Sequence, residues 1–275
     1  MISDVHIRNL KRHEEYNEVF NRLYKYINDT KTQDSIIVLG GDIVHAKTDM
    51  TPELIQMVQK FFKNCADLCY TVLITGNHDA NLNNKNRLDA LLPIVSALNH
   101  EHLIYLKDSG VYQIADKHFT VMSVFDKPID YVRANQFEAE YKIALHHGAV
   151  NSATTDLGIT LSNTHVTTDL FAGHDLVLLG DIHKMQFLDD KKRIAYPGSL
   201  IQQNYAEALV HGMLVWDTYT KKAEFVTIEN DICYYTLEIN NGSYTPIPAN
   251  LKGKSESLNA ASLRTLISIV LIYFI

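Results

Sequence analysis

The chain has 275 residues, which is enough for one large domain or for one domain with an appendage. Hydrophobic residues make up 46% of it, and 25 Lys and Arg against 32 Asp and Glu give a net charge of −7. A general nucleic-acid binder is more often basic, so any contact with DNA must come from a local basic surface or from a partner. Three cysteines exclude a disulfide framework and the start lacks a signal peptide, so we expect an intracellular, cytoplasmic protein.

The first part of the chain predicts helices that alternate with strands. Apolar residues at helical spacing favour helices, and short apolar runs that end in Gly and polar residues favour buried strands. In chain order we expect a helix over 13–29, a strand over 35–42, a helix over 51–68 that begins with Thr-Pro-Glu, a strand over 70–79, and a weaker helix over 86–98 that Pro93 interrupts.

The rest of the chain reads mostly as strands, over 102–108, 110–116, 118–126, 142–148, 175–184, 193–200, 213–219 and 223–230. Alternating elements followed by strands indicate an α/β domain in which two sheets pack face to face with helices outside.

Every strongly apolar strand in this series ends on polar side chains that can bind a metal ion. The candidates are Asp4 and His6 after Met1–Ser3, Asp42 after SIIVLGG, Asn77 and His78 after YTVLITG, His146 and His147 after KIAL, and Asp181 and His183 after LVLLG. The carboxyl ends of strands in open α/β sheets share one edge, where ligands bind. Five such strand ends together predict one metal-binding cleft.

These candidates are carboxylates, an amide and imidazoles, with no thiolate. Such donors suit octahedral ions of the Mn²⁺ or Fe²⁺ class, with Mg²⁺ as a further option. They are too many for one ion, whereas two ions roughly 3.5–4 Å apart, bridged by a carboxylate, would use them all. A pair of this kind acidifies a water and binds both the attacking and leaving oxygens of a phosphoryl centre.

The motifs DVH, GD, GNHD, LHHG and GDIH resemble the calcineurin-like metallophosphoesterases, over about residues 1–230. Within that family the series looks most like the SbcD nucleases, which include the meiotic-recombination-eleven subunit and phage recombination nucleases. GDIVH, ALHHG and IAYPGSL favour this branch. The resemblance implies a two-sheet β-sandwich flanked by helices, with four layers in the order αββα, as a nuclease domain over residues 1–230.

The resemblance also implies a role for each motif residue. The metal ligands form two sets around a bridging carboxylate: Asp4, His6 and His183 for the first ion, Asn77, His146 and Asp181 for the second, and Asp42 between them.

Strand alternation points only one of the two neighbouring histidines into the site. We assign His146, because it aligns with the family's Leu-His pair, and keep His147 as the alternative. His78 would be the general acid near the leaving oxygen, oriented by Asp79, and His45 would steer the nucleic-acid end at the edge.

Three departures from the family pattern stand out. Asp181 replaces a histidine of the last motif, which implies a harder metal preference. Only Met1–Ser3 precede Asp4, which indicates a misassigned start, a fragment or a shortened central strand. Residues 231–275 carry a linker and the apolar segment 266–275 in place of a capping domain. The apolar segment has only 10 residues, which is too short for a transmembrane helix. We therefore expect a terminal strand or helix, with an out-of-frame remnant or an anchor as alternatives.

We therefore expect a metal-dependent DNA phosphodiesterase, an SbcD-like exonuclease or endonuclease of DNA repair and recombination. Its expected partners are DNA, an SbcC-type ATPase and a second copy of the chain, with no membrane. The same motifs serve phosphatases and phosphodiesterases on other phosphoesters, and a catalytically weak scaffold for a recombination ATPase is a further alternative.

The basic stretch RNLKRH at 8–13 indicates a phosphate contact near the metals, or simply a solvated loop before a helix.

Overall fold

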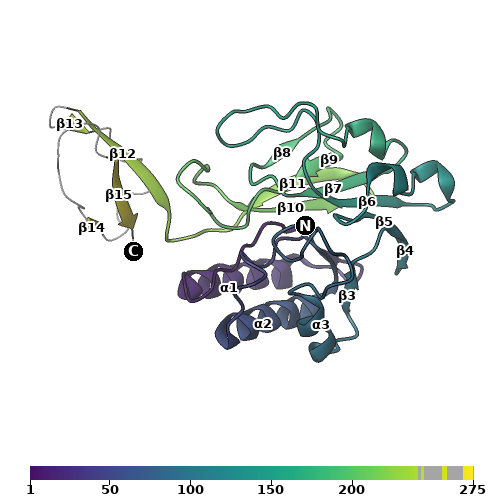
Figure 1. The fold of residues 1–275 in the computed structure, drawn as a ribbon, viewed down its shortest axis with the longest axis horizontal. Coiled ribbons are helices and arrows are strands. Elements are labelled where there is room, and N and C mark those ends of the chain that lie inside the picture. The colour runs from purple at the N-terminus through teal and green to yellow at the C-terminus, as the bar shows by residue number, and fades with distance from the viewer. Residues whose placement is uncertain (241–242, 245–255, 259–268, 275) are drawn as a thin grey trace.

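The computed structural model describes residues 1–240, 243–244, 256–258 and 269–274, and Figure 1 shows two sheets facing each other with helices on the outside. The smaller of the two facing sheets is parallel, with the strand order β1 (Ile36–Leu39), β2 (Tyr70–Ile74) and β3 (Leu103–Leu106). Its outer face packs against α1 (His13–Thr30), α2 (Pro52–Leu68) and α3 (Leu92–Leu98).

The helices follow the sequence pattern with one difference. Thr51 caps α2 as expected, because its side chain accepts a hydrogen bond from Leu54 N. The weaker helix predicted over 86–98 begins only at Leu92, with Pro93 in its first turn. Proline lacks an N–H and fits the first helical turn, so it starts this helix instead of interrupting it.

The larger sheet is mixed and has the strand order β4-β5-β6-β7-β9-β8. Four parallel strands form its centre: β5 (Lys117–Met122), β6 (Lys142–His147), β7 (Leu176–Gly180) and β9 (Ile194–Tyr196). The antiparallel strands β4 (Gly110–Ile114) and β8 (Gln186–Phe187) form its edges. The predicted fold of two sheets with helices outside is confirmed.

The two sides of the sandwich have different outer layers. In the described part of the chain, the outer face of the larger sheet is covered by loops and by the short 3-10 helices η1 (Pro128–Asp130), η2 (Ala134–Gln136) and η3 (Thr168–Phe171). Strand alternation separates the two cores: Leu145 and Leu178 lie between the sheets, and Ala144 and Val177 lie on the outer face.

The first two residues join β1 to a separate hairpin of β10 (Gly212–Asp217) and β11 (Lys222–Thr227). Met1 N donates to Leu214 O at 2.6 Å and Leu214 N donates to Met1 O at 3.1 Å, while Ile2 N donates to Val38 O at 2.9 Å. Residues Met1 and Ile2 therefore take the place of a very short strand between β10 and β1.

A small four-stranded sheet ends the chain, in the order β13 (Ser243–Tyr244), β12 (Tyr234–Asn240), β15 (Ile269–Phe274) and β14 (Glu256–Leu258). The apolar end of the chain thus contains a strand, which pairs antiparallel with β12. Most of the predicted linker over 240–257 lies outside the described residues, and the domain boundary stays a prediction. No helix in the described ranges has the length and apolarity needed to cross a membrane.

Candidate metal centre

The predicted ligands other than His146 converge at one edge of the sandwich, where the carboxyl ends of β1, β2, β6 and β7 meet the N-terminal segment. Main-chain contacts hold these ends together: Asp4 N donates to Gly41 O at 3.1 Å, and Gly148 N donates to Gly180 O at 3.1 Å. The His147 ring spans the two sheets, because its Nδ1 bonds Gly40 O at 2.7 Å. The edge that the sequence predicts is therefore one continuous structure.

The first group of donors consists of Asp4, His6 and His183. The Nε2 atoms of His6 and His183 lie 3.1 Å apart, and Asp4 Oδ1 lies 4.0 Å from the first and 3.9 Å from the second. Asp4 and His6 are buried, whereas His183 is partly exposed. These three side chains aim at a common point that faces the cleft.

The second group gathers around His147. Its Nε2 lies 3.0 Å from Asn77 Oδ1, 3.4 Å from Asp42 Oδ2 and 3.9 Å from Asp181 Oδ1. Asp42 Oδ2 also lies 3.6 Å from His6 Nε2. The Asp42 carboxylate therefore stands between the two groups, in the position expected of a bridging ligand.

His146, which we predicted as a ligand, lies outside this cluster. Its Nδ1 bonds Met122 O at 2.9 Å, and its ring packs beside Tyr131 and Phe171 on the outer face of the larger sheet. Residues along a strand alternate between the two faces, so His146 shares the face of Ala144. The assignment is therefore corrected from His146 to His147.

The donor sets fit two octahedral divalent ions. Donors at right angles around an ion with bonds of roughly 2.1 Å lie about 3 Å apart. The closest donor pairs here, at 3.0 and 3.1 Å, match that spacing. Oxygen and imidazole nitrogen atoms make up both sets, which suits ions of the Mn²⁺ class.

Four of these residues have a left-handed backbone, which is rare for residues other than glycine. Asp4 has φ 53°, His6 has φ 49°, Asp42 has φ 52° and Asp181 has φ 95°. Such conformations cost of order 1 kcal/mol or more each and cluster at functional sites. They turn successive side chains into the cleft instead of letting them alternate away from it.

The motif GNHD begins with glycine because the Asp42 carboxylate needs the space. A Cβ on Gly76 would lie 2.1 Å from Asp42 Oδ1. Asp42 Oδ1 accepts a hydrogen bond from His78 N at 2.8 Å, so the tight turn also fixes the bridging carboxylate.

Asp79 has a different role from the predicted one. Its buried carboxylate accepts bonds from Ile43 N, Val44 N and Gly76 N, at 2.9, 3.0 and 2.9 Å. It therefore fastens the loop after β1 to the loop after β2. The His78 ring is oriented by another group, the carbonyl of His45, which bonds His78 Nδ1 at 2.6 Å.

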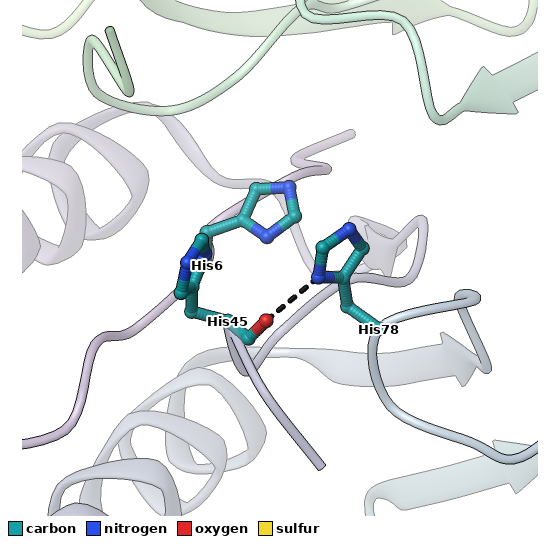
Figure 2. Close-up of side chains that lie close together, drawn as sticks. All are labelled: His6, His45 and His78. Carbon is teal, nitrogen blue, oxygen red and sulfur yellow. Dashed lines mark hydrogen bonds between the residues drawn. The ribbon is translucent and has the colours of Figure 1, made fainter. Parts of the chain in front are cut away.

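His45 and His78 lie close together, and Figure 2 shows both side chains with the His6 ring beside them. The His45 and His78 rings are stacked with centroids 5.7 Å apart, and the His78 ring lies 4.7 Å from that of His6. The bond to His45 O occupies His78 Nδ1, which leaves Nε2 for a leaving oxygen. Both rings thus lie beside the candidate ligand His6, and their predicted roles stay predictions.

The electrostatics of the cluster follow from burial and from the crowding of carboxylates. Burial raises the pKa of Asp4 to about 6, and it also raises the pKa of Asp181. Burial would raise the pKa of Asp42 as well, but the neighbouring His147 outweighs it and holds that pKa far below its usual range. Asp42 conversely raises the pKa of His147 well above 6.5 against the effect of burial. Without metal, a proton on His147 thus neutralises part of the buried negative charge.

Glu207 is a site residue that the sequence did not predict. Its carboxylate accepts from His183 Nδ1 at 2.7 Å, and also from Gln203 N at 2.7 Å and Ser199 Oγ at 3.1 Å. This contact raises the pKa of His183, although burial acts in the opposite direction. Glu207 lies 24 residues from His183, in a loop without a recognisable ligand motif, so no sequence signal identified it.

A larger cavity of about 920 Å³ lies elsewhere, between α1, the β10–β11 hairpin and the inner face of the larger sheet. None of the predicted site residues is among the residues that line it. The candidate metal centre at the strand ends therefore lies outside this cavity.

Comparisons with known proteins show the family to which the chain belongs. Residues 1–190 match the calcineurin-like phosphoesterase family. The chain is 45% identical over 262 residues to "Uncharacterized protein R555" of Acanthamoeba polyphaga mimivirus. That match covers 90% of this chain but 19% of the relative, so the chain spans about a fifth of the relative's length.

Two solved structures align with parts of the chain. One crystal structure aligns with a TM-score of 0.51 and 12% identity, covering 82% of this chain and 98% of that one. The Pseudomonas putida nuclease MPE aligns with a TM-score of 0.30 and 19% identity, covering 54% of this chain and 59% of that one. At 12% identity, the likeness to the first of these structures concerns the fold alone.

Proposed function

The chain belongs to the calcineurin-like phosphoesterase family. On that premise we propose that it is a metal-dependent hydrolase of phosphoesters, that its substrate is DNA and that it acts as an SbcD-like exonuclease. The observation that carries the proposal is the convergence of two donor groups around Asp42. The DNA assignment is supported by the branch-specific motifs and by the position of the GDIVH histidine, His45, beside His78.

In this proposal the two ions share one carboxylate. Asp4, His6 and His183 would hold the first ion, Asn77, His147 and Asp181 the second, and Asp42 both. When bound, a pair of divalent cations supplies Lewis-acid charge at the phosphoryl group and makes a water more acidic. Donors without thiolate favour Mn²⁺, with Fe²⁺ and Mg²⁺ as alternatives.

The protein's own groups orient the substrate and move the proton. His78 Nδ1 is held by His45 O, so the protonated ring can deliver its Nε2 proton to the leaving oxygen. Asp79 fixes the two loops that carry Asp42 and His78, and Glu207 fixes the His183 ring. Preorganised groups of this kind need little rearrangement during the reaction.

The test is hydrolysis of end-labelled duplex and single-stranded DNA by the Mn²⁺-loaded chain, with bis-p-nitrophenyl phosphate and p-nitrophenyl phosphate as comparisons. We expect degradation of DNA that EDTA stops and that Asp42→Ala abolishes. Hydrolysis of p-nitrophenyl phosphate without cleavage of DNA would show a phosphomonoesterase instead. A folded, metal-loaded sample that cleaves no ester would support the scaffold alternative.

His78→Gln tests the acid separately from the metals. We expect both ions to remain bound and the rate to fall by about 10²–10⁴-fold, the usual effect of losing acid–base help. Loss of an ion in this variant would instead make His78 a ligand. The expected SbcC-type ATPase and a homodimer stay predictions, which co-purification and light scattering would test.

A further inference from the structure

The basic stretch RNLKRH lies beside the candidate metal centre, and its side chains do not have the same role. Arg12 is satisfied within the protein, because it pairs with Glu15 at 2.5 Å and its guanidinium lies 4.9 Å from the centre of the Tyr234 ring. His13 bonds a backbone carbonyl at 2.8 Å and begins α1. Lys11 is exposed. Only Arg8 of this stretch contacts a residue of the cleft.

Arg8 is half-buried and has no carboxylate partner among the described residues. Its Nη1 lies 3.1 Å from His45 Nε2, and its Nη2 makes two long contacts of 3.4 Å to Gln203. Among the described residues, its buried Nε has no hydrogen-bond partner. A partly desolvated cation without a counter-charge is costly unless an anion binds there.

Arg8 lies close to residues of the candidate metal centre. The His45 ring that it contacts is stacked on His78 and lies 5.7 Å from the ring of His6, a candidate ligand. Lys47, two residues after His45, is exposed and donates to Asn77 O at 2.9 Å. Two cations thus lie at the mouth of a cleft in a chain whose net charge is −7.

We propose that Arg8 binds a second phosphate of the substrate, adjacent to the one that is cleaved, with His45 holding the guanidinium in place. The guanidinium offers a planar fork of donors that matches phosphate oxygens. A phosphomonoester has no second phosphate, so this contact favours a polynucleotide chain. The inference rests on the proposed nuclease function and names the residue that would select its substrate.

The experiment compares Arg8→Gln with the matched control Arg22→Gln, which removes the same charge from α1, where Arg22 pairs with Asp231. Both are assayed on bis-p-nitrophenyl phosphate, which has one phosphate, and on a labelled single-stranded oligothymidylate. We expect Arg8→Gln to lose about 10–100-fold in kcat/KM on the oligonucleotide and less than about twofold on the small ester. The control should match wild type on both, and circular dichroism confirms folding.

A binding measurement separates this inference from the proposed function. Fluorescence anisotropy in EDTA reports oligothymidylate binding without turnover, and Arg8→Gln should lower the slope of log Kd against log salt by about 0.7. If Arg8→Gln lowers this slope but the wild-type protein has no nuclease activity, the proposed function is overturned and the Arg8 contact stands. An unchanged slope, or equal losses on both substrates, would overturn the Arg8 contact.

Discussion

Neighbouring residues at the end of β6 have opposite environments, and this difference decides which of them can bind a metal. His147 lies between the sheets with Asp42 at 3.4 Å, whereas His146 lies on the outer face, where burial lowers its pKa to about 4. A buried neutral imidazole bonded to a carbonyl contributes to packing. The His147 imidazole lies near the carboxylates of Asp4, Asp42 and Asp181, and it would release its proton when it binds a cation.

Alanine substitutions of the two histidines should therefore have different effects. His147→Ala should lose the second ion and nearly all hydrolysis, because it removes the donor closest to Asn77 and Asp42. His146→Ala should keep the metal content and lower the free energy of unfolding by about 1–3 kcal/mol. Metal analysis and denaturant unfolding measure both effects. Loss of metal in the His146 variant alone would restore the original assignment.

Glu207 bonds the ring of His183, so it should affect the first ion through that ring if His183 is a ligand. A carboxylate bonded to the far nitrogen of a ligating imidazole fixes its tautomer and increases its basicity. Glu207→Gln should therefore weaken the first ion by about 10–100-fold. Calorimetric titration with Mn²⁺ measures this, and the exposed Glu224→Gln on β11 is the control. Equal affinities in the two variants would reduce Glu207 to a packing role.

The strand ends are the elements that build the site, and they approach each other closely across the two sheets. β7 ends at Gly180, where an added Cβ would lie 2.3 Å from Gly40 O, 2.4 Å from Ser3 Oγ and 2.6 Å from His147 Nδ1. The neighbouring bond from His147 Nδ1 to Gly40 O depends on this close approach. The spacing of the two donor groups is therefore set by the contact between β1 and β7.

Gly180→Ala should disturb this contact, because all three nearest atoms are held in place by the backbone or by hydrogen bonds to Gly40 O. We expect a loss of about 1–3 kcal/mol in stability and a weaker second metal site. Gly110→Ala is the control, since its new Cβ would meet only the Tyr112 ring, at 3.4 Å. Thermal unfolding and metal titration of both variants check the result. A fully stable Gly180 variant with normal metal affinity would contradict it.

At the scale of the whole molecule, several carboxylates lie in one buried cluster. Proton binding to this cluster therefore affects both the stability of the metal-free protein and its affinity for metal ions. Burial raises the pKa of Asp4 to about 6, and burial with Asp42 raises that of Asp79 to about 7, against the effect of its backbone donors. Without metal, the stability linked to these groups is present at low pH and is lost as pH rises through their folded pKa values. His147, whose pKa is also raised, acts in the same direction.

The metal-free protein should therefore lose thermal stability as pH rises from about 6.5 to 8. Above pH 6.5, His6 and His146, whose pKa values burial lowers, are neutral in both the folded and the unfolded state and no longer act in the opposite direction. The loaded protein should not lose stability in this range, because the ions replace the protons on the ligands. For the same reason the apparent affinity for Mn²⁺ should rise with pH, with more than one proton released per chain on loading near pH 6.5. Scanning calorimetry and titration in buffers of different ionisation enthalpy measure these effects. Metal binding that releases no proton would contradict the expectation.

The sequence by itself determined the alternation of elements and the two-sheet fold. Apolar periodicity and turn residues are local signals, and they identified β1, β2, β6 and β7 together with the polar residues at their ends. The order of those ends along the chain was enough to predict a single cleft, since parallel strands share an edge. The one helix boundary that was wrong, at Leu92, depended on how a single proline is used.

Only the tertiary structure decided which side chains face that cleft. Both faces of β6 are apolar, so its sequence does not say which one lies between the sheets, and His147 replaces His146 for that reason. Asp79 proved to bind backbone N–H groups because the turn brings Ile43 and Val44 to it from another loop. Glu207 contacts His183, which lies 24 residues away in the chain, and Arg8 contacts His45, which lies 37 residues away. Such contacts depend on packing between distant segments, which local periodicity does not encode.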